Sequence, residues 1–177
     1  KGLHLPNAGE YGVGFIFFPT EKGIAAECKE IFERAAEKLN IEIIGYRNVP
    51  VNKSTIGPTA LSVEPIMEQV FVKKPEHVKD AADFERKLFI LRNYASHTIN
   101  NTIKKGEIDF YITSLSPNVI VYKGQLTSHQ VREYFPDLSD KRVVSAFGLV
   151  HSRFATNTFP SWKLAQPRSE ERRVGKE

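Results

Sequence analysis

The stretch from residue 11 to residue 18, YGVGFIFF, constrains the fold most strongly, because it is strongly apolar and rich in aromatic and β-branched side chains. Such a run is typical of a buried β-strand. Its most apolar part, residues 13–18, is far shorter than the roughly 18 residues that cross a bilayer, so we expect no membrane partner. Gly12 and Gly14 lack the third glycine of a dinucleotide-binding loop and favour close backbone approach or a bulge within the strand.

Two stretches show the three- and four-residue spacing of apolar side chains that predicts amphipathic helices. The first covers residues 21–39. The second covers residues 80–103, with Asp80 or Asp83 available as the N-cap and Gly106 following its end. We expect both helices to turn an apolar stripe toward the core.

The single cysteine, Cys28, lies on the apolar stripe of the first predicted helix. A free cysteine at such a position is usually buried, so we interpret it as a core residue. A thiol nucleophile would need a positively charged environment, of which the sequence gives no sign. One cysteine excludes an internal disulfide and a cysteine-based zinc cluster, and we expect no metal in this chain. The chain shows no basic-then-apolar leader, so we expect a reducing, cytoplasmic location.

Further runs of β-branched and aromatic residues predict strands at residues 41–46, 66–72, 110–115, 119–123 and 143–154. The third and fourth of these form a predicted hairpin around Ser116-Pro117-Asn118, which is good turn chemistry. Residues 51–65, with two prolines and a glycine, predict a loop with one short extended piece. Thr127 and Gln130 have the spacing of a capping box and predict a short helix.

Strands interrupted by two long helices predict an α+β fold, a sheet packed against helices without internal repeats. The length of 177 residues is that of one domain. Hydrophobic residues make up 41% and charged residues 26%, which excludes disorder as a description of the whole chain. The 25 basic and 21 acidic residues are interleaved, and no nucleic-acid-binding signature is present, so we expect no nucleic-acid partner.

Polar side chains gather at residues 151–158, where the last predicted strand ends. Strand alternation places His151 and Arg153 on one face and Ser152 and Phe154 on the other. Phe154 is then available to anchor the strand, while the planar fork of Arg153 is free to bind a carboxylate or phosphate through two hydrogen bonds.

The alternative interpretation of Arg153 is a structural arginine paired with an internal Asp or Glu, and the residue types alone leave both interpretations open. A serine-histidine hydrolase built from His151 and Ser152 is excluded, because neighbours on a strand point to opposite faces and cannot share a proton.

Three segments carry a family resemblance. They are LP with GEYGVG within residues 5–14, the SLS, IVYKG and PDL elements within residues 110–138, and HSRFATNTFPSWKLAQP within residues 149–167. In this order they resemble the class II glutamine amidotransferase domain of the glutamate synthase family. The resemblance covers roughly residues 3–167, and its last segment is highly specific.

The resemblance implies a four-layer αββα sandwich of the N-terminal-nucleophile hydrolases, here incomplete at both ends. Such a domain hydrolyses L-glutamine to glutamate and ammonia. In the parent enzyme, the ammonia passes through a tunnel to a distant site with FMN and an iron–sulfur cluster, where it combines with 2-oxoglutarate and the imine is reduced. The implied partners are L-glutamine, the remaining domains of glutamate synthase, and a nicotinamide-dependent subunit or ferredoxin as electron donor. A plant or algal parent would place it in the plastid stroma.

The resemblance also implies roles for individual residues. Arg153 matches the arginine that binds the α-carboxylate of glutamine. Thr156 matches a position near the same substrate, and Phe154 and Asn157 flank it. Trp162, beside a proline, is interpreted as a packing residue of the loop.

The family mechanism also needs an N-terminal cysteine, whose amino group is the general base, and an Asn-Gly pair as oxyanion hole. We find neither in the sequence and therefore expect no catalytic residue here. We interpret residues 1–167 as an internal part of the domain, inactive in isolation, and the charged residues 168–177 as a non-native tail. The alternative is a non-catalytic binding or structural module that kept the amidotransferase fold.

Overall fold

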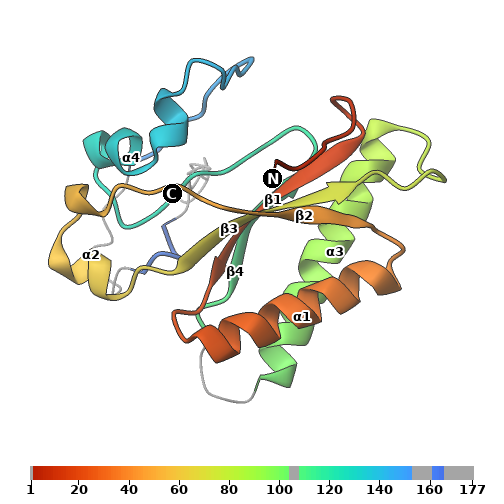
Figure 1. Ribbon diagram of the computed structural model, residues 1–177, viewed down its shortest axis with the longest axis horizontal. Helices are drawn as coiled ribbons and strands as arrows, with labels where there is room; N and C mark the ends of the chain where they lie inside the picture. The colour runs from red at the N-terminus through yellow and green to blue at the C-terminus, as the bar shows by residue number, and fades with distance from the viewer. Residues whose placement is uncertain (1, 104–107, 153–160, 166–177) are drawn as a thin grey trace, which may run out of the picture.

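The computed structural model describes residues 2–103, 108–152 and 161–165. In chain order its elements are β1 (Tyr11–Phe18), α1 (Lys22–Lys38), β2 (Ile43–Asn48), the 3₁₀ turn η1 (Lys53–Thr55), α2 (Pro58–Ser62), β3 (Ile66–Lys73), α3 (Ala81–Thr102), β4 (Tyr111–Ser116), α4 (Ser128–Tyr134) and the 3₁₀ turn η2 (Pro136–Ser139). The four strands form one antiparallel sheet of order β2-β3-β1-β4 (Figure 1). The predicted α+β class is confirmed.

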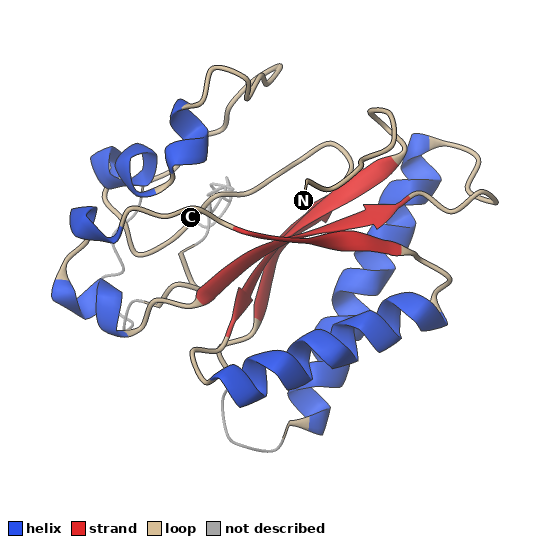
Figure 2. Cartoon of the chain, viewed as in Figure 1, coloured by secondary structure: helices blue, strands red, loops and turns tan. Residues whose placement is uncertain are grey.

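The two long helices, α1 and α3, lie together against one face of the sheet (Figure 2). The apolar stripes predicted from the sequence supply this part of the core, and Cys28, Phe32, Leu88 and Leu91 are fully buried there. Burial and the nearby Glu27 carboxylate raise the pKa of the Cys28 thiol to about 11. A thiol that stays protonated is a poor nucleophile, which supports its interpretation as a core residue.

The helices α3 and α4 begin directly after the capping residues that the sequence predicts. The Asp80 carboxylate accepts a hydrogen bond from the Asp83 amide at 2.7 Å, so Asp80 is the N-cap of α3. At α4, the Thr127 amide donates to the side-chain oxygen of Gln130 at 2.9 Å, which is one half of the predicted capping box. Both caps were recognisable because they depend on residues three apart in the sequence.

β1 lies between β3 and β4, and its side chains alternate between two buried faces. Ile16 and Phe18 join the core beneath the helices. Phe15 and Phe17 join a second cluster on the opposite face, which we call the aromatic face and which comprises Phe15, Phe17, Val49, Met67, Tyr134, Phe135 and Trp162. The segments that cover this face are α4, η2 and the loops beside them (Figure 2).

The glycines of β1 mark close packing. A Cβ atom on Gly14 would lie 2.6 Å from Val70 Cγ1 on β3 and 3.0 Å from Leu115 Cδ1 on β4. One on Gly12 would lie 2.5 Å from Leu88 Cδ1 on α3. The predicted close approach is confirmed at both glycines. A register shift against β4 falls beside them, between Phe15 and Ile16.

Gly14→Ala is expected to destabilise the chain by about 1–3 kcal/mol, because Val70 is a stiff β-branched residue that cannot move away from the new methyl group. Gly23→Ala is the matched control, since nothing lies within 4 Å of a Cβ atom there and alanine favours the helix. Urea unfolding of both variants measures the difference. Equal midpoints for Gly14→Ala and the unmodified chain would contradict the packing described here.

Two predicted strands are not strands in the structure. Residues 143–152, the described part of the predicted strand 143–154, form no ladder, and Val144, Phe147 and Val150 are more than 80% exposed. An apolar run becomes a strand only when it pairs with another strand, and this run pairs with neither edge strand of the described sheet, β2 or β4. Residues 153 and 154 lie outside the described residues.

The return arm of the predicted hairpin, residues 119–123, is also irregular. Its central residue, Val121, is held by side chains instead of a ladder. The Val121 amide donates to Ser114 Oγ at 3.1 Å, and Thr113 Oγ1 donates to the Val121 carbonyl at 3.1 Å. Hydroxyl groups on β4 thus take the place of strand-to-strand hydrogen bonds. The turn itself forms as predicted, with Ser116 Oγ accepting from the amides of Asn118 and Val119.

Residues 51–65 were expected to hold an extended piece, which is wrong, because they contain η1 and α2 instead. Asn52 accepts a hydrogen bond from the Ser54 amide, and Pro58 occupies the first turn of α2, where its missing N–H costs nothing. Among the described residues, no helix is long and apolar enough to cross a membrane.

Candidate functional site

The four candidate substrate residues, Arg153, Phe154, Thr156 and Asn157, lie outside the described residues. The structure describes the chain on either side of them. Upstream, His151 and Ser152 are exposed and belong to no helix or strand. Downstream, residues 161–165 form a turn, which we call the anchor turn. The contacts of the anchor turn are therefore the nearest described geometry to the candidate residues on the downstream side.

Trp162 fixes the anchor turn to the aromatic face. Its indole Nε1–H donates to the Ala60 carbonyl at 3.0 Å. Its ring packs edge-on against Phe17 with centroids 6.3 Å apart and lies 5.5 Å from the ring of Tyr134. A Cβ atom on Gly124 would lie 2.3 Å from the indole, so only glycine fits beneath it. The interpretation of Trp162 as a packing residue is confirmed.

Lys123 makes a second attachment to the anchor turn. Its Nζ donates to the Lys163 carbonyl at 2.8 Å and lies 3.9 Å from the centroid of the Tyr111 ring. The side chain is buried, and burial together with the positive charge of Arg92 lowers the pKa of Lys123 to about 8. The Lys163 side chain pairs with Asp109 at 3.5 Å. Sequence reasoning missed Lys123, because a single lysine after a run of apolar residues gives no signal of burial.

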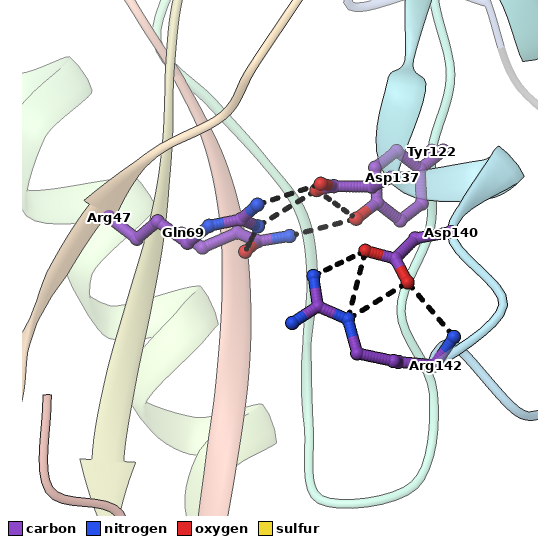
Figure 3. A network of polar contacts seen from close by, with 6 residues as sticks. All are labelled: Arg47, Gln69, Tyr122, Asp137, Asp140 and Arg142. Carbon is purple, nitrogen blue, oxygen red and sulfur yellow. Dashed lines mark hydrogen bonds and ion pairs between the residues drawn. The ribbon is translucent and has the colours of Figure 1, made fainter. Parts of the chain in front are cut away.

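A closed polar network ties the sheet to η2 on the same side (Figure 3). Arg47 donates two hydrogen bonds to the Asp137 carboxylate, at 2.7 and 2.8 Å, and a third to the Gln69 side-chain oxygen at 2.8 Å. The Tyr122 hydroxyl donates to Asp137 at 3.0 Å and accepts from Gln69 Nε2 at 3.1 Å. Because the fork of Arg47 is already occupied, this arginine is structural and not a substrate ligand.

The network shifts the pKa values of its members. Arg47 and Tyr122 donate hydrogen bonds to the charged Asp137 carboxylate, so they hold its pKa below the usual range. Burial and the Asp137 charge raise the pKa of Tyr122 to about 12. Both shifts favour an ionised Asp137 and a protonated Tyr122 at neutral pH, which suits the hydrogen bond between them.

The Asp137 shift predicts a pH dependence of stability. Because the folded-state pKa is lower than the unfolded one, the unfolded state binds more protons in acid, and this contribution is complete above about pH 4 and lost as the pH falls through the folded pKa. We expect Asp137→Asn to lower the unfolding midpoint at pH 7 and to differ less and less from the unmodified chain as the pH is lowered into the acid range. Asp140→Asn, at the exposed pair with Arg142, is the control with a small effect at either pH. A difference that persists at low pH would contradict this assignment.

The loop after β2 is joined to α4 by a buried carboxylate. Glu64 accepts a hydrogen bond from the Tyr134 hydroxyl and pairs with Lys53. Gln130 Nε2 donates to the Thr55 carbonyl at 2.7 Å, and the Asn52 amide donates to the Tyr134 carbonyl at 2.8 Å. These contacts join α4 to the residues on both sides of α2, and the Ala60 carbonyl of α2 accepts the hydrogen bond from Trp162. The part of the scaffold that binds Trp162 is therefore itself held by hydrogen bonds between residues far apart in the sequence.

The described residues form the scaffold next to the candidate residues. Within them, no three His, Cys, Asp or Glu side chains come together as a metal site. Two shallow pockets of about 180 and 220 Å³ lie along α1, lined mainly by helix residues, on the helical side of the sheet. Neither touches the anchor turn. The aromatic face is thus the side of the sheet to which the chain beyond the candidate residues is attached.

Comparison with known proteins places this scaffold in a family. The model of the family described as "Glutamine amidotransferases class-II" matches residues 1–173. The chain belongs to the class II glutamine amidotransferases. The resemblance inferred from three motifs is confirmed, since the match extends over nearly the whole amidotransferase chain.

Relatives of this amidotransferase chain are glutamate synthases. It is 46% identical to the NADH glutamate synthase of Schizosaccharomyces pombe over 171 residues, which cover 94% of the chain and 8% of that protein. It is 42% identical to the NADPH glutamate synthase large chain of Bacillus subtilis over 167 residues, covering 94% of the chain and 11% of that protein. It is 40% identical to the ferredoxin-dependent glutamate synthase of Pyropia yezoensis over 156 residues, which cover 88% of the chain and 10% of that protein. The amidotransferase chain thus spans about a tenth of the length of these relatives.

Proposed function

We propose that this chain is part of the glutaminase domain of a glutamate synthase. The domain hydrolyses the side-chain amide of L-glutamine, and the ammonia released serves the reductive amination of 2-oxoglutarate to a second glutamate. The observation that carries the proposal is the similarity to glutamate synthases over 94% of the chain at 42–46% identity, together with the family match over residues 1–173.

Within this function, Arg153 binds the α-carboxylate of glutamine through its planar fork, and Thr156, Phe154 and Asn157 line the same subsite. A guanidinium matches a carboxylate with two parallel hydrogen bonds, which a lysine ammonium cannot reproduce. The occupied fork of Arg47 illustrates the structural alternative: an arginine whose donors are taken by Asp137 and Gln69 has none left for a substrate. The nucleophilic cysteine and the oxyanion donors of the mechanism belong to other parts of the parent protein.

The sheet with α1 and α3 is one half of the four-layer αββα sandwich, with the aromatic face turned toward the second sheet. The apolar residues 143–150 support this arrangement, because they have the composition of a strand and are exposed in the chain by itself. In this proposal residues 1–167 belong to the amidotransferase domain and residues 168–177 are a non-native charged tail, whereas the family match runs to residue 173.

The cofactors of the proposed parent lie outside this segment. FMN and an iron–sulfur cluster supply the electrons for the reduction in the remaining domains, and the electron donor is a nicotinamide-dependent subunit or ferredoxin. A single buried cysteine gives the chain no set of thiolates for such a cluster. The parent works in the cytoplasm, or in the plastid stroma of a plant or alga.

Isotope transfer tests the proposed function. The full-length protein is supplied with L-glutamine labelled with ¹⁵N in the side-chain amide, with 2-oxoglutarate and with a reduced electron donor. We expect the label in the amino group of newly formed glutamate. Glutamine that remains unhydrolysed under these conditions would favour the non-catalytic module instead.

A further inference from the structure

Besides the Lys163–Asp109 pair, the anchor turn makes two polar contacts with the scaffold, which involve Lys123 and Trp162. Lys123 brings a charged ammonium into a buried position, where it must be compensated by hydrogen bonds or other favourable contacts. The Lys163 carbonyl, at 2.8 Å, and the face of the Tyr111 ring, at 3.9 Å, provide this compensation. The second attachment is the indole hydrogen bond from Trp162 to the Ala60 carbonyl.

The two attachments come from different segments of the scaffold. Lys123 follows the segment that β4 holds through Thr113 and Ser114, whereas Ala60 lies in α2. The anchor turn is therefore fixed between two separate parts of the scaffold, both of which are themselves held by long-range hydrogen bonds.

We propose that Lys123 and Trp162 are positioning residues for glutamine use, which act by fixing the backbone of the anchor turn. The inference rests on the proposed function, in which Arg153 stands eight residues before the start of the turn and binds the substrate carboxylate. A binding group is effective only when the backbone that carries it is held near the productive geometry. Neither Lys123 nor Trp162 contacts the substrate in this proposal.

A positioning role and a purely structural role predict different kinetic effects of a substitution. Loss of a structural contact lowers the amount of folded enzyme and reduces glutamine-dependent and ammonia-dependent synthesis equally. Loss of a positioning contact raises KM for glutamine and leaves the ammonia-dependent reaction intact, because free ammonia bypasses the glutamine site.

The test is steady-state kinetics of the full-length enzyme with glutamine and, separately, with ammonium as nitrogen source. Lys123→Met keeps an unbranched apolar side chain and removes the ammonium group. We expect KM for glutamine to rise about tenfold, since a hydrogen bond from a charged donor is lost, with kcat and the ammonia-dependent rate within about twofold of the unmodified enzyme. Lys79→Met, at an exposed lysine, is the matched control and leaves both reactions unchanged.

Trp162→Phe keeps an aromatic ring and removes the N–H that reaches Ala60, so we expect a smaller rise of about threefold in KM for glutamine. If Lys123→Met does not fold, the KM of Trp162→Phe for glutamine tests the inference by itself. Unchanged KM for glutamine in the folded variants, or equal losses with glutamine and ammonium, would overturn the inference while leaving the proposed function intact. An unmodified enzyme that releases no ammonia from glutamine would overturn the proposed function and the inference with it.

Discussion

In the full-length enzyme, Arg153→Lys is expected to lower kcat/KM for glutamine by about ten- to a hundredfold. The substitution keeps the positive charge but loses one hydrogen bond of the proposed bidentate contact with the substrate carboxylate, and such a bond to a charged group contributes about 1.5–3 kcal/mol. Glutamate synthesis from free ammonium should continue at the rate of the unmodified enzyme. Initial rates with each nitrogen source measure the two effects separately.

The matched control is Arg142→Lys, at an arginine close in sequence whose pair with Asp140 is largely exposed. An exposed ion pair contributes little, so this variant should keep both activities. Arg153 would be a structural arginine if its substitution reduced glutamine-dependent and ammonia-dependent synthesis to the same extent. That result would leave the subsite of the proposed function without its main residue.

The second large effect is expected at the centre of the aromatic face. Phe15 is fully buried, and its ring packs edge-on against Phe17, Tyr122 and Phe135, with centroids 5.1 to 6.1 Å apart. Phe15→Ala should destabilise the chain by about 3–5 kcal/mol, through lost burial and the cavity left among the rings. A loss of this size is a large part of the total stability of a domain.

Phe89→Ala, at a phenylalanine of α3 that is 63% exposed, removes the same side chain from the opposite side of the molecule and should cost less than about 0.5 kcal/mol. Urea unfolding followed by circular dichroism compares the two variants. Equal losses at Phe15 and Phe89 would mean that the aromatic face is not packed as described.

The elements that the sequence predicts well are those whose signals are local. The helices α1 and α3 follow from apolar spacing, and the starts of α3 and α4 follow from Asp80 and Thr127, each of which bonds a residue three positions on. β1 is predicted by its composition because it is buried on both faces and needs no alternation.

The misses share one cause, which is dependence on residues far away in the sequence. Residues 143–150 have the composition of a strand, but composition does not say which edge will pair with them. The return arm at Val121 is held by hydroxyl groups of Thr113 and Ser114, where a ladder was expected. Arg47 pairs with Asp137, which is 90 positions away in the sequence, and the residues around either one give no sign of this pair.

The same contrast between local and long-range signals applies to the candidate site. Arg153 was singled out by residue type and by a family motif, and it lies outside the described residues, so its role stays a prediction. Lys123 and the Ala60 carbonyl became visible only through the three-dimensional contacts of Lys163 and Trp162. The sequence thus names a candidate for the residue that binds the substrate, and the structure describes the contacts of the anchor turn that follows it.

Binding of the glutamine carboxylate by Arg153 is tested by comparing L-glutamine with its α-methyl ester as substrates for the full-length enzyme and for Arg153→Ala. Esterification removes the carboxylate charge that Arg153 is proposed to bind. We expect the unmodified enzyme to hydrolyse the ester with kcat/KM lower by about a hundredfold, and Arg153→Ala to distinguish scarcely between the two substrates. Discrimination of the same size in both enzymes would contradict a contact between Arg153 and the carboxylate of glutamine.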